Sequence, residues 1–227
     1  MGSDDLSKTL ARASAMLFDF DGPLCDVFAG LPAPRVASDL ARQAASRDPE
    51  LGAKLTETDD PLEVLRLTFE ADQRLGLQVE QTLTDAEVEA VAVAGDPTAG
   101  AESALEAAKA TGRRIAVVSN NSAECVRSFL ARHSLDMYVC EVIGRPVNRP
   151  DLMKPHPHSL FRAAELLQVD PSDCVLIGDS LTDIQAAHLA GSTAIGYANK
   201  PRKREAFAEA GAEAVIEHME AISAAMR

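Results

Sequence analysis

The sequence lacks any apolar run that approaches the roughly 18 residues a helix needs to cross a bilayer. It opens with Met-Gly-Ser-Asp-Asp-Leu and so also lacks the basic segment followed by an apolar stretch that marks a secretory leader. We therefore expect a cytoplasmic protein that has no membrane partner.

Positive charge is scarce. Lys and Arg together number 22, against 35 Asp and Glu, which gives a formal net charge of −13. A field of this sign repels nucleic acid and anionic membrane surfaces. Nucleic acid is therefore excluded as a partner, and if the substrate is an anion, local cations must capture it.

Two familiar kinds of motif are absent. The cysteines are few, lie far apart and match no zinc-binding spacing, so we interpret them as buried, reduced thiols: Cys25, Cys125, Cys140 and Cys174. No Gly-x-x-x-x-Gly-Lys segment occurs, which argues against a nucleotide-dependent kinase of that type.

The bulk composition is that of a folded protein. Of the 227 residues, 46% are hydrophobic and 25% are charged, close to globular averages. This length suits one large domain, or a core domain that carries a smaller insert.

An acidic pair ends the first predicted strand. The apolar residues 15–18 are followed at once by Asp19, Asp21 and Gly22. Isolated carboxylates near a core are costly unless a cation meets them, so an Asp-x-Asp at this position suggests a metal or a reactive centre. The alternative is a simple strand stop, because Asp and Gly are ordinary turn residues.

The next part of the chain, residues 24–93, contains no strand-like run. Helices are predicted over residues 35–47, over residues 61–75 and from Thr84, where Thr-Asp-Ala-Glu has the pattern of a capping box closed by Glu87. Helices alone between two strands indicate an inserted helical unit. We therefore expect a core domain made of residues 1–23 and 94–227, with a second domain over residues 24–93.

From residue 95 onward, strands and helices alternate. Strands are predicted over residues 114–119, 138–143, 174–178, 193–197 and 214–216, and helices over residues 97–110, 123–133, 158–168, 182–190 and 202–210, with one last helix at the end. Such alternation predicts a parallel sheet that is covered on both faces. Sheets of this kind bind ligands at the carboxyl ends of their strands.

Polar side chains follow four of the strands or begin the next helix: Asp19 and Asp21, Ser119 and Asn120, Lys154, and Asp179 and Asp183. All would meet at one edge of the sheet. This composition suits a divalent cation beside a phosphoryl group, because Mg²⁺ prefers one or two carboxylates, waters and a phosphate oxygen. Ser119 and Asn120 can hydrogen-bond phosphate oxygens, and Lys154 can neutralise charge that develops there.

The chain resembles the haloacid dehalogenase superfamily of phosphohydrolases, in the phosphoglycolate phosphatase-like branch that carries a helical cap after the first strand. Four motifs in the family's order support the resemblance: Asp19-Phe20-Asp21-Gly22, Ser119-Asn120, Lys154-Pro155, and Gly178-Asp179-Ser180 with Asp183. The resemblance covers nearly the whole chain. It implies an α/β fold with a Rossmann-like parallel sheet core and an inserted helical cap domain.

The resemblance also implies a role for each matching residue. Asp19 would be the nucleophile that forms an aspartyl-phosphate, and Asp21 would be the general acid and base. Substrate binding would fall to Gly22, Ser119, Asn120 and Lys154, while Mg²⁺ would be held by Asp19, the Asp21 backbone carbonyl, Asp179 and, in support, Asp183. The cap would act as a lid.

The function so implied is a Mg²⁺-dependent phosphatase that hydrolyses a small phosphate monoester. Its partner would be a small phosphorylated metabolite, and the protein would be a monomer or a homodimer. One position departs from the family pattern: Pro23 follows the motif glycine, removes a backbone donor and favours an extended Gly22.

Several alternatives remain beside this function. A phosphomutase of the same fold would keep all four motifs, and a non-catalytic binding module could reuse the fold, although none of the expected groups is lost. A 2-haloacid dehalogenase would lack Asp21. Gly178-Asp179-Ser180-Leu181 also matches an esterase signature with Ser180 as nucleophile, but no later Asp-x-x-His completes a triad.

Overall fold

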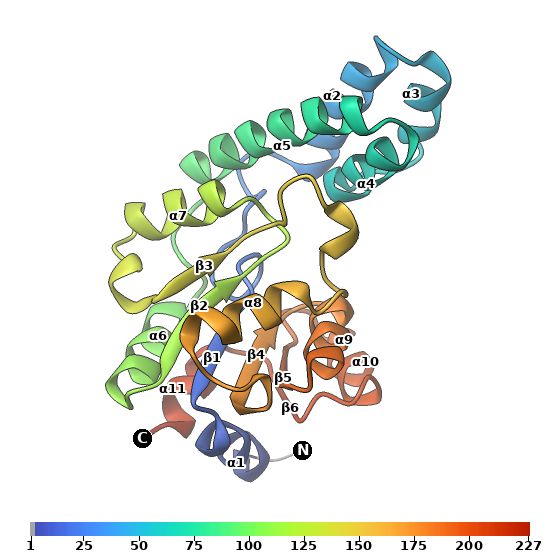
Figure 1. The fold of residues 1–227 in the computed structure, drawn as a ribbon. Helices are drawn as coiled ribbons and strands as arrows, with labels where there is room; N and C mark the ends of the chain where they lie inside the picture. Colours follow the sequence, from blue (N-terminus) through green and yellow to red (C-terminus); the bar gives the residue numbers. More distant parts are fainter. Residues whose placement is uncertain (1–2) are drawn as a thin grey trace.

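A six-stranded parallel sheet forms the centre of the structure, a computed structural model that describes residues 3–227 (Figure 1). Its order is β3-β2-β1-β4-β5-β6, and every neighbouring pair is parallel. The strands are β1 (Ala15–Phe18), β2 (Arg114–Val118), β3 (Glu141–Ile143), β4 (Cys174–Gly178), β5 (Thr193–Tyr197) and β6 (Ala214–Ile216). The predicted α/β fold with a Rossmann-like parallel sheet is confirmed.

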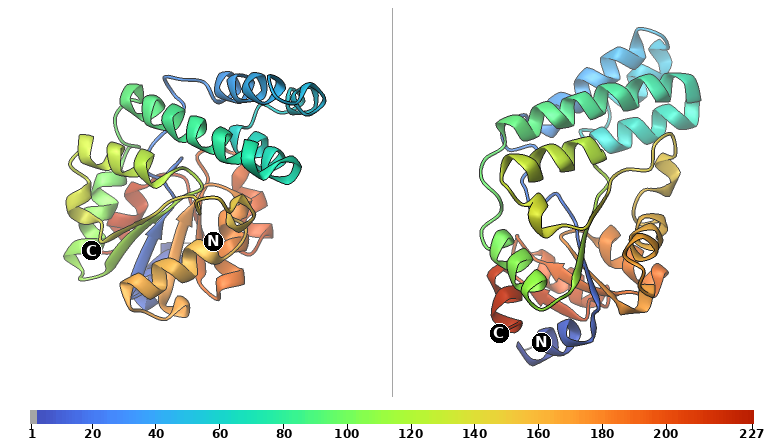
Figure 2. Two further views of the ribbon diagram at one scale, coloured as in Figure 1. Left: turned by 45° about the horizontal axis from the view of Figure 1, so that its top comes forward. Right: turned by 60° about the vertical axis from the view of Figure 1, so that its left-hand side comes forward.

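Helices cover both faces of this sheet (Figure 2). On β1, Met16 and Phe18 pack into one apolar core, whereas Leu17 packs into the other. The first core is closed by α1 (Ser3–Arg12), α6 (Ala101–Ala110), α7 (Ala123–Arg132) and α11 (Glu220–Ala225), and the second by α8 (His158–Leu167), α9 (Leu181–Ala190) and α10 (Lys203–Glu209). Burial on both sides explains why the strands are almost wholly apolar.

The segment between β1 and α6 contributes four helices at one end of the sheet (Figure 1). They are α2 (Ala33–Ala45), α3 (Pro49–Leu55), α4 (Pro61–Ala71) and α5 (Gln73–Val93). They share an apolar core of their own, in which Leu40, Leu65 and Leu83 are almost fully buried. We call these four helices the insert. The predicted domain boundaries at residues 24 and 93 stay a prediction.

The capping box predicted at Thr84 is wrong. Thr84 lies inside α5, a helix of 21 residues whose N-cap is Asp72. The Asp72 carboxylate accepts from the backbone N–H of Arg74 at 2.7 Å and of Leu75 at 3.1 Å. Glu87 is fully buried, and its carboxylate accepts from the Ser122 backbone N–H instead. A Thr and a Glu three residues apart on a buried helix face have the same local pattern as a cap, which explains the error.

Other differences from the sequence predictions are local. The helices α1 and α3 were not predicted, and β3 is shorter than expected because a 3₁₀ helix occupies Asp136–Tyr138. Within residues 3–227, no helix combines the length and apolar character that crossing a membrane requires.

The cysteine prediction needs one correction. Cys25, Cys125 and Cys174 are buried free thiols, but Cys140 is exposed. Burial raises the pKa of Cys174 to about 11 and raises the pKa of Cys25 and Cys125 further. The buried thiols therefore remain protonated near neutral pH and are poor nucleophiles.

Candidate active site

The carboxyl ends of β1, β2 and β4 open onto a cavity of about 440 Å³ between the sheet and the insert. Asp19 follows β1, Ser119 follows β2 and Asp179 follows β4. The other sequence-predicted residues that line the cavity are Asp21, Asn120, Lys154 and Asp183. Gly22 lies just behind Asp179, where it contacts that side chain. All the predicted site residues thus lie at one place.

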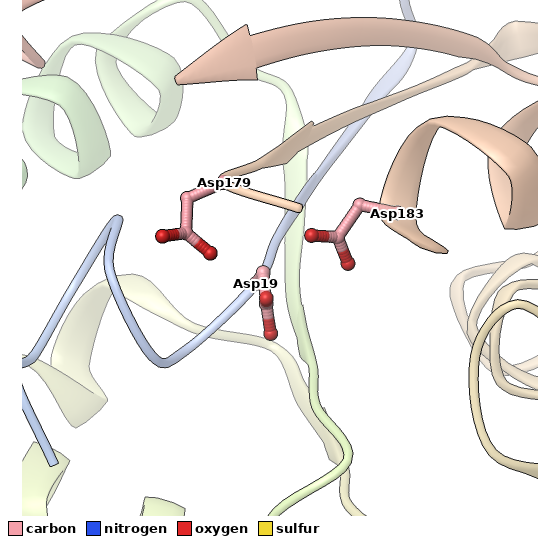
Figure 3. Close-up of side chains that lie close together, drawn as sticks. All are labelled: Asp19, Asp179 and Asp183. Carbon is pink, nitrogen blue, oxygen red and sulfur yellow. The ribbon is translucent and has the colours of Figure 1, made fainter. Parts of the chain in front are cut away.

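Three carboxylates form the floor of the cavity (Figure 3). Asp19, Asp179 and Asp183 each offer an oxygen, and these atoms lie within 4.8 Å of one another. An all-oxygen donor set suits a hard cation such as Mg²⁺. The Oδ1 atom of Asp183 is buried and lies 2.6 Å from Lys154 Nζ. The residues present therefore fit a divalent metal ion.

The orientation of Asp183 is set by a capping box at the start of α9. The Ser180 backbone N–H donates to Asp183 Oδ2 at 3.0 Å, and the Ser180 hydroxyl donates to the same atom at 2.7 Å. The other oxygen, Oδ1, is thereby directed to the cavity floor. Ser180 serves as a helix cap, which is not the environment of an activated esterase nucleophile.

Lys154 connects the carboxylates. Its Nζ lies 2.8 Å from Asp19 Oδ1 and 2.6 Å from Asp183 Oδ1, and it donates to the Val118 carbonyl at 3.0 Å. Burial by itself would lower the pKa of Lys154, but the two carboxylates outweigh burial and raise the pKa above its usual value. Lys154 is therefore a permanent cation beside the acidic floor.

The pKa of both motif aspartates lies above its usual value. Burial, reinforced by Asp183, raises the pKa of Asp19 well above its usual value, and Lys154 opposes this shift. Burial also raises the pKa of Asp21 to about 6, although the Val27 backbone N–H donates to its Oδ1 at 3.1 Å. A carboxyl group that titrates near 6 can both give and take a proton near neutral pH. The Lys154 cation therefore favours the ionised form of Asp19 against the effect of burial.

The Asn120 side chain makes contacts that the sequence did not predict. Its Oδ1 accepts from the Lys154 backbone N–H at 2.9 Å, and its Nδ2 donates to the Lys154 carbonyl at 3.2 Å. Asn120 therefore fixes the main chain that carries Lys154. The hydroxyl of Ser119 accepts from the Asn121 backbone N–H at 3.0 Å and lines the cavity. A direct phosphate contact of either residue stays a prediction.

The turn after the first motif requires glycine. Gly22 has φ +96°, so Pro23 does not impose the extended conformation that we expected before a proline. The turn closes through a hydrogen bond from the Gly22 N–H to the Cys25 carbonyl at 2.7 Å. A Cβ atom at Gly22 would stand 2.5 Å from Cγ of Asp179. The glycine is thus needed for its conformation and for the close approach of Asp179.

We expect Gly22→Ala to reduce any activity of this site about tenfold or more, because the added methyl group must displace Asp179 while the backbone keeps a strained φ. The matched control is Gly95→Ala, where the new Cβ meets no atom within 4 Å. Steady-state rates and thermal unfolding of both variants check this. Equal activity of the two variants would contradict it.

Two residues that sequence analysis missed hold Asp179. Lys203 Nζ lies 2.6 Å from Asp179 Oδ2, and Asn199 Nδ2 donates to the same oxygen at 3.0 Å. Asn199 follows the carboxyl end of β5, and Lys203 begins α10. The rule that polar residues after a strand end gather at the site would have found Asn199, had it been applied to this fifth strand.

A buried ion pair joins the insert to the core beside the cavity. Arg145 donates to Glu87 Oε1 at 2.8 Å and to the Asn120 carbonyl at 3.1 Å, and the Ser122 N–H donates to Glu87 Oε2 at 2.9 Å. The side chains of Arg145 and Glu87 are 1% and 0% exposed. Because Asn120 positions Lys154, this ion pair links α5 to the site.

We expect Arg145→Met to lower the free energy of unfolding by about 3–5 kcal/mol, because it leaves Glu87 buried and unpaired. The double variant Arg145→Met/Glu87→Gln should regain part of that loss. Arg149→Met, which removes an exposed partner of Asp151, is the control and should change stability by less than about 1 kcal/mol. Urea unfolding measures all three, and a neutral Arg145→Met would contradict the expectation.

Comparison with known proteins identifies the family. A family model described as haloacid dehalogenase-like hydrolase matches residues 13–191. The phosphoglycolate phosphatase of Neisseria meningitidis is 28% identical over 84% of this chain and 83% of its own length. The plasmid phosphoglycolate phosphatase of Cupriavidus necator is 35% identical over 55% of this chain, a match that spans 53% of that protein.

A solved structure agrees in fold. The β-phosphoglucomutase of Clostridium difficile superposes with a TM-score of 0.66 at 18% identity, over 92% of each chain. The family model covers well over half of the chain, and the parallel sheet with helices inserted after β1 agrees with the fold that the resemblance implies. The chain belongs to the haloacid dehalogenase-like hydrolase family, as the resemblance in its sequence indicates.

Proposed function

We propose that this protein is a Mg²⁺-dependent phosphatase that hydrolyses a small phosphate monoester through an aspartyl-phosphate on Asp19. The observation that carries the proposal is the position of Lys154 Nζ, within 2.8 Å of Asp19 and 2.6 Å of Asp183, beside a third carboxylate on one cavity floor. A nucleophile, a fixed cation and an all-oxygen metal set in one cavity suit phosphoryl transfer.

The proposed hydrolysis has two steps, the formation and the breakdown of the aspartyl-phosphate, and side chains of this protein account for both. In the first, an Asp19 carboxylate oxygen bonds to phosphorus, the ester P–O bond breaks, and the protonated Asp21 gives its proton to the leaving alkoxide. In the second, water attacks the same phosphorus, Asp21 takes the water proton, and the Asp19–phosphorus bond breaks to release inorganic phosphate. Lys154 offsets negative charge near Asp19 in both steps.

The metal would be held by Asp19, Asp179 and the main-chain carbonyl of Asp21, with Asp183 in support. When bound, Mg²⁺ neutralises charge on the phosphoryl oxygens and fixes their orientation. Asn199 and Lys203, through their contacts with Asp179 Oδ2, would set how that carboxylate meets the metal.

A phosphomutase is the second candidate, because a β-phosphoglucomutase shares the fold. A mutase returns the phosphoryl group to a sugar hydroxyl, whereas a phosphatase releases it to water. The two relatives described above are both named as phosphatases, which favours the hydrolytic function. A non-catalytic binding module is disfavoured because the nucleophile, the lysine and all the carboxylates are present.

The cavity volume of about 440 Å³ suits a small metabolite. Because the protein has a formal net charge of −13, nucleic acid and anionic membranes are unsuitable partners for it. We propose that the protein is cytoplasmic and that it is a monomer or a homodimer.

The test is a panel of small phosphate monoesters, including phosphoglycolate and β-glucose 1-phosphate, assayed for inorganic phosphate with Mg²⁺ and again after chelation by EDTA. We expect phosphate release from at least one ester, with a fall of at least about 100-fold after chelation and recovery on adding Mg²⁺. Release that is unaffected by EDTA would overturn the metal dependence. Isomerised sugar phosphate without phosphate release would favour the mutase.

A further inference from the structure

The wall of the cavity that faces the carboxylate floor belongs to the insert and to the loop before it. It consists of Phe28, Ala33, Pro34, Asp59, Asp60, Pro61 and Leu62. This wall is where the alcohol half of a phosphate ester must lie when its phosphoryl group sits at Asp19. Its only charged side chains are the two aspartates. The wall is therefore apolar and negative.

Positive charge is missing from this wall. Among the described residues that line the cavity, the single cation is Lys154, which is buried between Asp19 and Asp183 on the floor. The nearest cations along the insert do not line it: Arg35 and Lys54 are exposed, and Arg66 lies 2.7 Å from Glu63. A carboxylate on the alcohol half would thus find no partner there.

Two helix starts face the cavity, and a helix start usually favours an anion. At these two helix starts, most of the backbone N–H donors are missing or already donate a hydrogen bond within the protein. Pro34 near the start of α2 and Pro61 at the start of α4 have no N–H, and the Leu62 N–H donates to the Asp60 carboxylate at 2.9 Å. The carboxylate of Asp60 also places a full negative charge at the positive end of α4. Few backbone N–H groups are therefore left for a carboxylate at either helix start.

We propose that the protein selects phosphate monoesters whose alcohol half is neutral or positively charged, and that Asp59 and Asp60 discriminate against esters that carry a carboxylate. This inference rests on the proposed phosphatase function, and it separates this chain from relatives whose name is phosphoglycolate phosphatase. Discrimination of this kind arises from repulsion as much as from attraction.

Three esters of the same size test the proposal: 2-aminoethyl phosphate, 2-hydroxyethyl phosphate and 2-phosphoglycolate. They differ at one end group, which is cationic, neutral or anionic. With Mg²⁺ at low ionic strength, we expect kcat/KM for the aminoethyl ester to exceed that for phosphoglycolate at least about tenfold, with the hydroxyethyl ester between them. The ratio should shrink as salt is raised to about 0.5 M, because salt screens exposed charges.

The variant Asp59→Asn/Asp60→Asn identifies the residues responsible. Asn also caps helices well, so α4 should be preserved. We expect the aminoethyl-to-phosphoglycolate ratio to fall at least about fivefold in this variant. Glu57→Gln removes a nearby exposed carboxylate that does not line the cavity, and it should leave the ratio unchanged.

The outcomes separate the two proposals. Preference for phosphoglycolate in the wild type, with Mg²⁺-dependent release intact, would overturn the selectivity and leave the phosphatase standing. An unchanged ratio in the double variant would remove Asp59 and Asp60 from the explanation and so overturn their proposed role. Absence of phosphate release from all three esters and from the wider panel would overturn both.

Discussion

The variant Asp19→Asn should lose at least about 1,000-fold of the phosphatase activity, because an amide cannot attack phosphorus as a carboxylate does. The loss should appear in kcat for every ester that the wild type hydrolyses, since the covalent step is common to all of them. The measurement is inorganic phosphate release under saturating Mg²⁺.

Folding and specificity controls accompany this variant. Lys154 keeps its contact with Asp183 when Asp19 is neutral, so thermal unfolding should be changed far less than activity. Asp26→Asn removes an exposed carboxylate from the same loop and should retain near-normal rates. If Asp19→Asn is folded and fully active, the aspartyl-phosphate mechanism is wrong.

The second large effect is expected for Lys154→Met, in both activity and stability. Loss of the ammonium group leaves Asp19 and Asp183 close together in a buried site with no cation between them. The free energy of unfolding should fall by about 3–5 kcal/mol in the metal-free protein, because breaking a buried pair leaves uncompensated charge. Activity should fall at least about 100-fold, because the phosphoryl group loses its fixed cation.

A second substitution distinguishes these two effects. In Lys154→Met/Asp183→Asn, the floor has one fewer carboxylate, so part of the stability should return while activity stays low. Lys8→Met, at an exposed lysine of α1 at the end of the sheet opposite the insert (Figure 1), is the control for removing a lysine. Urea unfolding and phosphate release are measured on all of them. A Lys154→Met protein with wild-type rates would exclude this lysine from the reaction.

The sheet was predictable because its strands are short, apolar and separated by helical patterns. β4 and β5 were predicted to the residue, since each is a five-residue run bounded by polar or turn residues. Helix ends in the insert were less predictable. The start of α5 was missed because Asp72 caps it without a preceding strand or loop signal, while Thr84 and Glu87 imitate a cap farther along.

The candidate site was predictable where residues directly follow a strand, as Asp19 and Asp179 do. The site was not predictable where tertiary contacts decide which residues belong to it. In the sequence Glu87 has the pattern of a capping-box residue, and only its contact with Arg145 makes it part of the buried link to the site. Asp60 has the pattern of an ordinary N-cap, and nothing local indicates that it also borders a cavity.

The continuous helix α5 has a consequence for how substrate enters. It runs without a break from the α2–α4 end of the insert to its packing against α7, and the Glu87–Arg145 ion pair fastens it there (Figure 1). Moving α2–α4 away from the sheet would require either a bend in α5 or the loss of the Glu87–Arg145 ion pair. One unbroken helix and a buried ion pair therefore oppose movement of α2–α4 away from the cavity.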